Sequence, residues 1–230
     1  MRLIAALALA FGTPVAAQEI TAAQLTQPTD RYDHAVLGDA LEWGGLDLAL
    51  SDGRRLTFTL PATRVFEDVE ARLGDFDGDG APEVMVVETD IARGASLAIY
   101  DATGKRAATA FIGQTHRWLA PAGWGDFNGD GRIEIAYVDR PHLARELVFV
   151  RYDGTRLTEI ARAPGFTNHQ IGDSAISGSV SRCAGTDRLV LASADWSRLM
   201  SVQLTATGPA ASDLGPLRRK SDLARAQRCP

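Results

Sequence analysis

The sequence predicts an all-β protein: a small β-propeller-like array of about four to five antiparallel blades with four strands each. Two observations carry this prediction. β-rich runs are separated by Asp-Gly-type turns. A Gly-Asp anchor also recurs, in the stretches Val36–Asp39, Arg72–Asp75, Gly123–Asp126 and Gln170–Asp173. An open stack of sheets is the alternative, because the anchors by themselves do not require the units to close into a ring.

The two central units are the most complete. In each, a short strand precedes Gly-Asp, and a β-rich run follows the next loop, at Pro82–Thr89 or Ile133–Asp139. Polar turns then separate two further strands in each unit, at Ala95–Asp101 and Arg106–Ile112, and at Glu146–Asp153 and Arg156–Arg162. Short strands joined by such turns predict a four-stranded antiparallel unit.

The outer units are less regular. The first is shortened, and the last keeps strands at Arg188–Asp195 and Leu199–Leu204 but has lost the acids of its loop. We therefore assign residues 18–207 to the propeller-like domain. Residues 208–230 are predicted to form a C-terminal tail with a short helix capped by Ser221.

The first 17 residues have the pattern of a signal peptide. Arg2 precedes an apolar run at Leu3–Phe11, and a Gly12/Pro14 break leads to small residues before Gln18. The run is too short to span a bilayer, and no second apolar stretch follows. The pattern predicts cleavage and export, to the periplasm or the medium, without a membrane span. A buried core helix is the weaker alternative.

Composition narrows the class of protein further. The chain has 230 residues and a formal charge of −5, which disfavours nucleic-acid binding. It has two cysteines, Cys183 and Cys229, which predict a disulfide in an oxidising compartment. That bond would hold the tail on the domain and stabilise it by about 4 kcal/mol on the chain-entropy model. A redox-active pair is the weaker alternative, because such pairs have C-x-x-C spacing and these two cysteines do not. We expect a monomer.

An acidic hexapeptide occurs twice, at Asp75–Gly80 and Asp126–Gly131, and predicts two Ca²⁺ sites. Ca²⁺ takes about six to eight oxygen ligands, and alternate positions of a loop can converge on it. The first set of candidate ligands is Asp75, Asp77, Asp79, the Ala81 carbonyl and Glu83; the second is Asp126, Asn128, Asp130, the Arg132 carbonyl and Glu134. An EF-hand would need a glutamate where Val86 and Tyr137 stand. A metal-free Asx-type turn is the alternative.

The stretches GDFDGDGAPEVMVV and GDFNGDGRIEIAYV resemble FG-GAP/VCBS repeats, the blade units of integrin alpha-chain-like β-propellers. The resemblance is strong over these two units and weaker from Ala35 to Leu204. It implies Ca²⁺ between the first and second strands of a blade, held by the acidic and asparagine ligands named above. Propellers of this family commonly have seven blades, for which this chain is too short. The family includes binding modules and some enzymes, so it leaves function open.

A second set of candidate residues is expected on the face opposite the calcium loops. His34, His116 and His169 precede predicted first strands, and His142 lies in a second-to-third connection. Such connections also repeat an Asp-then-Arg theme, in Asp90/Arg93, Asp139/Arg145 and Asp195/Arg198. Each pair could bridge its own hairpin, for under about 1 kcal/mol. Alternatively they line, with the histidines, Arg117, Trp118 and Trp196, a mouth for an anionic or sugar-like ligand or a partner protein.

These patterns favour an exported, non-catalytic, calcium-binding module that binds a protein or an anionic or sugar-like ligand. The alternative is an exported hydrolase or lyase acting on a carbohydrate or phosphoester. Its centre would be a metal held by His34, His116 and His169, with Asp90 or Asp139 as base. No nucleophile elbow, H-E-x-x-H, P-loop or dinucleotide motif is present. A scaffold without a small-molecule site is the third possibility.

Overall fold

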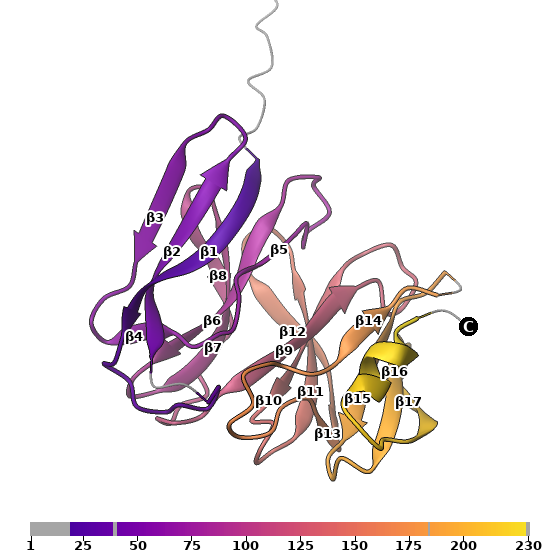
Figure 1. The fold of residues 1–230 in the computed structure, drawn as a ribbon. Coiled ribbons are helices and arrows are strands. Elements are labelled where there is room, and N and C mark those ends of the chain that lie inside the picture. The colour runs from indigo at the N-terminus through magenta and orange to yellow at the C-terminus, as the bar shows by residue number, and fades with distance from the viewer. Residues whose placement is uncertain (1–18, 39–40, 184, 229–230) are drawn as a thin grey trace, which may run out of the picture.

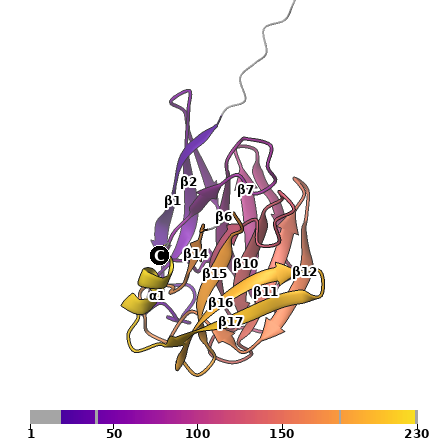
Figure 2. The same cartoon turned by 90° about the vertical axis from the view of Figure 1, so that its right-hand side faces the viewer.

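The computed structural model describes residues 19–38, 41–183 and 185–228, and these form seventeen strands and one short helix. The strands make three antiparallel sheets, which follow one another in chain order from the indigo to the yellow end of the molecule (Figure 1, and turned by 90° in Figure 2). None of the three closes on itself. The prediction of an all-β chain of antiparallel sheets is confirmed.

The first sheet has eight strands, because the shortened first unit joins the second. A single backbone pair, Trp43 with Phe66, connects the two units. The strands are β1 (Ile20–Thr29), β2 (Glu42–Leu50), β3 (Arg55–Thr59), β4 (Arg64–Phe66), β5 (Arg72–Gly74), β6 (Glu83–Asp90), β7 (Gly94–Asp101) and β8 (Gly104–Ala108).

The second sheet is a four-stranded unit of the predicted kind. Its strands run in the order β9 (Leu119–Gly125), β10 (Glu134–Asp139), β11 (Glu146–Tyr152) and β12 (Leu157–Pro164). Hairpins join all neighbours, so chain order and sheet order coincide. The second acidic stretch occupies the connection between β9 and β10.

The third sheet contains β13 (Phe166–Thr167), β14 (Ser179–Ser181), β15 (Arg188–Ser193), β16 (Arg198–Thr205) and β17 (Gly208–Pro216). Strand β17 lies in the predicted tail, so the tail prediction is wrong for these nine residues. They pair with β16 along its whole length. The strand is mostly exposed and lacks the apolar alternation that marks a strand in sequence.

Helix α1 (Ser221–Ala226) follows and covers the end of the third sheet. Its N-cap residue is Lys220, without a side-chain cap bond, so the prediction that Ser221 caps the helix is wrong. Asp222 instead accepts the backbone N–H of Arg218 and Arg219, both at 3.1 Å. Leu223 is the buried residue that attaches the helix to the sheet.

The core lies between successive units of the chain, within the first sheet as well as between sheets, which explains why the middle strands read as continuous apolar runs. In β6, Val84 and Val86 pack toward Leu46 of β2, while Met85 and Val87 pack on the other face. That second cluster includes residues of the second sheet, such as Ile135. Successive side chains of a strand point to opposite faces, so a strand covered on both sides needs apolar residues at every position.

The single helix among the described residues is six residues long, and no described helix is long and apolar enough to cross a membrane. The predicted signal peptide, residues 1–17, lies outside the described residues. So does Cys229, one half of the predicted disulfide. Both features stay predictions.

Candidate metal loops and a histidine pocket

The first acidic loop connects β5 to β6 and is curled around the carboxylate of Asp75. This carboxylate accepts the backbone N–H groups of Gly78 at 2.7 Å and Gly80 at 3.1 Å. Both glycines have positive φ, 80° and 91°, a region that side chains with a Cβ disfavour. The D-x-D-G-D-G spacing therefore shapes the loop through local contacts, which sequence can encode.

Three carboxylates of this loop converge. One oxygen each from Asp75, Asp77 and Glu83 lie within 4.8 Å of one another. Asp79 lies outside this cluster and accepts the N–H of Ala81 at 2.7 Å. Glu83 is 6% exposed, and its carboxylate accepts the Phe76 N–H at 2.9 Å.

Glu83 is a buried acid without a basic partner in the described part of the chain. Burial, together with the charges of Asp77, Asp79 and Asp75, raises its pKa to about 7. Burying a carboxylate is costly unless a positive charge compensates it. An all-oxygen donor set of this kind suits a hard divalent cation such as Ca²⁺. The first loop thus fits the ion that the sequence predicts.

The second loop connects β9 to β10 and repeats the backbone pattern of the first. Asp126 accepts the N–H groups of Gly129 at 2.7 Å and Gly131 at 2.9 Å. The buried Glu134 accepts the Phe127 N–H at 3.0 Å. The side chains that complete the loop are Asn128, which donates to Asp130 at 3.1 Å, and Asp130, which accepts the Arg132 N–H at 2.9 Å.

Arg151, on β11, distinguishes the second loop and was not among the predicted site residues. Its Nη2 donates to Asp130 Oδ2 at 3.0 Å and also to Glu134 Oε1. The second loop therefore has a positive side chain on two of its predicted metal ligands. The signal in sequence was weak, because Arg151 stands 17 residues beyond Glu134 and meets it only through the β10–β11 hairpin.

The four histidines gather at the opposite end of β9 from the second acidic loop, since His116 precedes this strand and Asp126 follows it. His34, His116 and His142 line a cavity of about 280 Å³ with Arg117 and Trp118. We call this cavity the histidine pocket. Its remaining lining residues are Arg140, Pro141, Leu143 and Ile171.

His169 lies behind the pocket, buried, and its hydrogen bonds define its tautomer. Nε2 lies 2.9 Å from the carbonyl of Asp173, which can only accept, so Nε2 carries the proton. Nδ1 then accepts from His142 Nε2 at 3.0 Å. Burial lowers the pKa of His142 to about 4 and also lowers the pKa of His169. Both rings are neutral at physiological pH. Because both nitrogens of His169 are engaged, the arrangement does not favour the metal centre predicted with His34 and His116.

Glu67 contacts two lining residues of the pocket, His34 and Trp118, and was not among the predicted site residues. It is fully buried, with one carboxylate oxygen 2.5 Å from His34 Nδ1 and the other accepting the Thr89 hydroxyl at 2.6 Å. Burial raises the pKa of Glu67, and the contact with His34 opposes this effect. The Trp118 indole N–H donates to the Glu67 carbonyl at 2.8 Å. Glu67 thus positions both His34 and the aromatic wall.

His116 closes the other side of the pocket. Its ring stacks on Tyr32 with centroids 5.2 Å apart, and its Nε2 lies 2.9 Å from a carboxylate oxygen of Asp33. Its backbone N–H donates to the Tyr32 hydroxyl at 2.8 Å. The centroids of the His34 and His116 rings are 5.2 Å apart, so the two imidazoles form one surface.

The predicted Asp/Arg pairs do not line the pocket. Asp90 and Arg93 bridge their own hairpin at 2.7 Å. Asp139 instead pairs with Arg140 at 2.9 Å and Arg162 at 3.4 Å; within the described residues it forms no ion pair with Arg145. These residues therefore do not join the predicted mouth. Asp90 and Arg93 bridge their own hairpin, as the alternative prediction had it, whereas Asp139 has Arg140 and Arg162 as partners in place of Arg145.

The third pair, near the C-terminus, is also separated. Asp195 accepts the hydroxyls of Ser193 and Ser197, while Arg198 pairs with Asp213 of β17 at 2.8 Å. Trp196 packs in the small cluster beneath α1 and is not part of the histidine pocket. The unforeseen strand β17 explains the change of partner.

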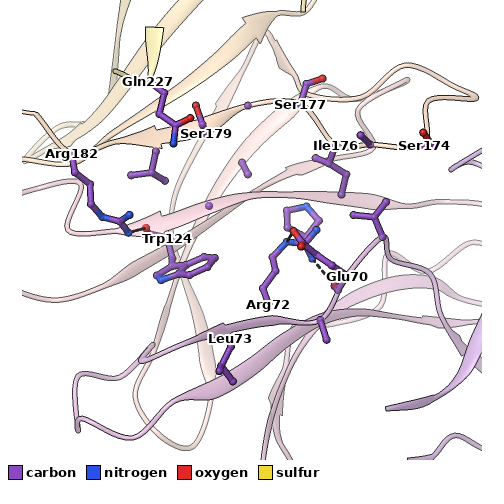
Figure 3. A pocket seen from close by; sticks show the side chains of 18 residues that line it. Glu70, Arg72, Leu73, Trp124, Ser174, Ile176, Ser177, Ser179, Arg182 and Gln227 are labelled. Atoms are coloured by element: carbon purple, nitrogen blue, oxygen red, sulfur yellow. Dashed lines mark hydrogen bonds and ion pairs between the residues drawn. The ribbon is translucent and has the colours of Figure 1, made fainter. Parts of the chain in front are cut away.

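A larger hollow of about 660 Å³ opens between β5, β9 and β14 (Figure 3). Its arginines are already engaged in holding the fold. Arg72 makes two bonds to the buried carboxylate of Asp68, at 2.9 and 2.8 Å, and Arg182 donates to the Trp124 carbonyl at 3.2 Å. We therefore place the candidate ligand site in the smaller histidine pocket.

The sheets and loops define a class: all-β proteins in which short antiparallel units carry an acidic Asx-type loop between two strands. Residues 75–137 match the family model of the FG-GAP-like repeat. The chain thus contains an FG-GAP-like repeat, which confirms the resemblance, and the match includes both acidic loops. Comparisons with curated proteins and with solved structures found no match.

Proposed function

We propose that this chain is an exported, calcium-stabilised, propeller-type module that binds an acidic segment of a partner protein in the histidine pocket. The observation that carries the proposal is the pocket itself. Three imidazoles line a cavity together with Arg117, an arginine without an ion pair among the described residues, and with the exposed apolar side chains of Leu143 and Ile171. Export rests on the leader pattern at residues 1–17, and the repeat type agrees with a binding module.

The chemistry of the pocket wall favours an anion. Arg117 donates to the His116 carbonyl at 2.9 Å and forms no ion pair among the described residues. A guanidinium with free donors is suited to a carboxylate. At the rim, Leu143 is 62% and Ile171 75% exposed, and they offer apolar contact to whatever carries that carboxylate. A peptide with an acidic side chain next to an aliphatic one meets both requirements.

The calcium part of the proposal rests on the first acidic loop. Ca²⁺ bound there would neutralise Asp75, Asp77 and Glu83, and so hold the β5–β6 connection in shape. The second loop was predicted to bind in the same way. Both loops lie away from the histidine pocket, so the role of the ion is structural.

One observation favours a second candidate function, hydrolysis or elimination at the same pocket. A buried carboxylate next to His34 is how proteins orient an imidazole as a general base. Among the described residues, the cavity lining contains no serine, threonine or cysteine, so hydrolysis would use water as the attacking group. The substrate would then be a carbohydrate or phosphoester.

The test uses calorimetric titration of the folded chain with a synthetic Leu-Glu peptide, and with its Leu-Gln counterpart. We expect binding of the acidic peptide alone, and its loss in Arg117→Ala. Arg93→Ala is the matched control, because Arg93 is an exposed arginine whose partner is Asp90. Equal binding of both peptides, or of neither, would overturn the proposal. Turnover of a phosphoester or glycoside that disappears in His34→Ala would favour the second candidate.

A further inference from the structure

The two acidic loops form an internal comparison within one chain. In both loops the first aspartate accepts the N–H groups of two glycines. In both, a buried glutamate accepts the N–H of the phenylalanine seven residues before it. Their backbones are thus equivalent. What differs is the side chain that the next strand of each sheet brings to the buried glutamate.

The strand register identifies that side chain. In the second sheet, Ile135 pairs with Val150, and Arg151 is the next residue along. In the first sheet, Val84 pairs with Tyr100, and the corresponding next residue is Asp101. Arg151 beside Glu134 and Asp101 near Glu83 therefore occupy equivalent positions in the two sheets. Asp101 pairs with Arg106 at 3.3 Å.

Charge separates the loops more strongly than geometry does. The first has four acidic candidate ligands: Asp75, Asp77, Asp79 and Glu83. The second has three, because Asn128 replaces one aspartate, and Arg151 contacts two of those three. The formal charges are therefore −4 for the first loop and −3 + 1 = −2 for the second. Asp187, which accepts the Asp126 N–H, is itself 3.7 Å from Arg182.

We infer that Arg151 is the built-in counter-cation of the second loop, which therefore takes up no Ca²⁺ at concentrations that fill the first loop. The guanidinium already uses the oxygens of Asp130 and Glu134 that an ion would need. It would also repel a divalent cation at close range. Glu134 is fully buried, so Arg151 supplies the compensation that Glu83 lacks. The inference rests on the proposed calcium binding for the first loop only.

Arg151→Gln tests it, by calorimetric titration of Ca²⁺ into chelator-treated protein. We expect one bound ion in the parent and two in Arg151→Gln, with the affinity of the second loop raised about tenfold or more. Adding Asp130→Ala to Arg151→Gln should remove the gained ion. Arg156→Gln is the control, because Arg156 is an exposed arginine that pairs with Asp153 in the following turn. Arg151→Lys keeps the charge and should still bind one ion.

The outcomes separate this inference from the proposed function. Two ions of similar affinity in the parent overturn the inference and leave calcium binding intact. No ion in the parent removes the calcium role of the first loop; if Arg151→Gln then also binds none, the inference fails as well, whereas an ion gained in Arg151→Gln supports it. If circular dichroism shows that Arg151→Gln does not fold, Ca²⁺ binding to two single variants of the parent, Asp77→Ala and Asp130→Ala, tests the inference instead. Loss of the ion in Asp77→Ala but not in Asp130→Ala supports the inference, and the reverse overturns it.

Discussion

At the scale of single residues, buried polar side chains distinguish the two ends of the molecule. Near the acidic loops, Glu83 and Glu134 occupy equivalent places, yet only Glu134 has a cationic partner in the described part of the chain. Near the pocket, His142 and His169 share one hydrogen bond and remain neutral because they are desolvated. The histidine pair is therefore sensitive to protons, whereas Glu83, which lacks a cationic partner among the described residues, is the group that a divalent ion would compensate.

The histidine pair should make stability depend on pH. An unfolded histidine titrates near 6.5, whereas His142 in the fold titrates at about 4. Between these values the unfolded state binds a proton that the folded state does not, so the free energy of unfolding falls as pH falls. His34, Arg145 and Lys220 add to the effect through their charges, and Asp173 opposes it.

For a fully buried ring, a change of this size in the pKa corresponds to about 3 kcal/mol. Because His142 is only half-buried, solvent screening reduces the loss that we expect between pH 7 and 4 to on the order of 1–2 kcal/mol, and the loss levels off below pH 4. Urea unfolding across this range, for the parent and for His142→Gln, measures it. The variant should have a shallower slope, and the carboxylates common to both chains cancel in the difference. Identical slopes would mean that His142 is protonated equally in the folded and unfolded states.

At the scale of elements, the turns decide which residues reach the pocket. Gly94, at the start of β7, has a φ of 76° and lies against the segment that carries His116. A Cβ at this position would come within 2.4 Å of the Gln114 carbonyl oxygen and 2.7 Å of the Arg117 carbonyl oxygen. The close approach of two backbones, rather than turn formation alone, therefore requires glycine here.

Gly94→Ala should destabilise the chain by about 2–4 kcal/mol, because strain at positive φ adds to a clash with rigid backbone. Gly53→Ala is the matched control. Gly53 has a φ of 86°, but a Cβ added there would meet no atom within 4 Å, so only the conformational cost of about 1 kcal/mol applies. Urea midpoints compare the two variants. Equal losses would show that the segment near His116 moves aside at little cost.

At the scale of the whole molecule, stability comes from stacked sheets without ring closure. Apolar clusters join the first sheet to the second and the second to the third. The acidic loops lie at the junctions of this stack. Gly154, in the β11–β12 turn, approaches Asp77, and Thr186, next to β15, approaches Gly129. Order in each loop is therefore linked to the packing between neighbouring sheets.

Removal of Ca²⁺ should consequently lower the melting temperature of the entire chain. At a free ion concentration about one hundred times Kd, binding stabilises the folded state by about 2.7 kcal/mol. Thermal melts with Ca²⁺ and with chelator measure this difference. Asp77→Ala should abolish the response, whereas Asp130→Ala should retain it. A melt that chelator leaves unchanged would remove the structural role of the ion.

Much of the fold followed from local pattern. The strands of the two central units, the antiparallel pairing and the curled acidic loops all depend on alternation, turn residues and the D-x-D/N-x-D-G spacing. Strand β17 did not follow from local pattern, because its residues are mostly exposed and it forms by pairing with the edge of β16. The convergence of His34, His116 and His142 was expected from their loops. Glu67, which supports His34, was not, because a buried acid has no sequence signature of its own.

The sequence alone determined the β class, the repeat and the backbone geometry of both acidic loops, because these depend on residues a few positions apart. The tertiary structure decided which charges meet. It brought Arg151 next to the buried Glu134 but Asp101 near the buried Glu83. It also paired Arg198 with Asp213 instead of Asp195, and it placed the Glu67 carboxylate against His34. These contacts join distant segments through strand register and sheet packing, which local spacing does not specify.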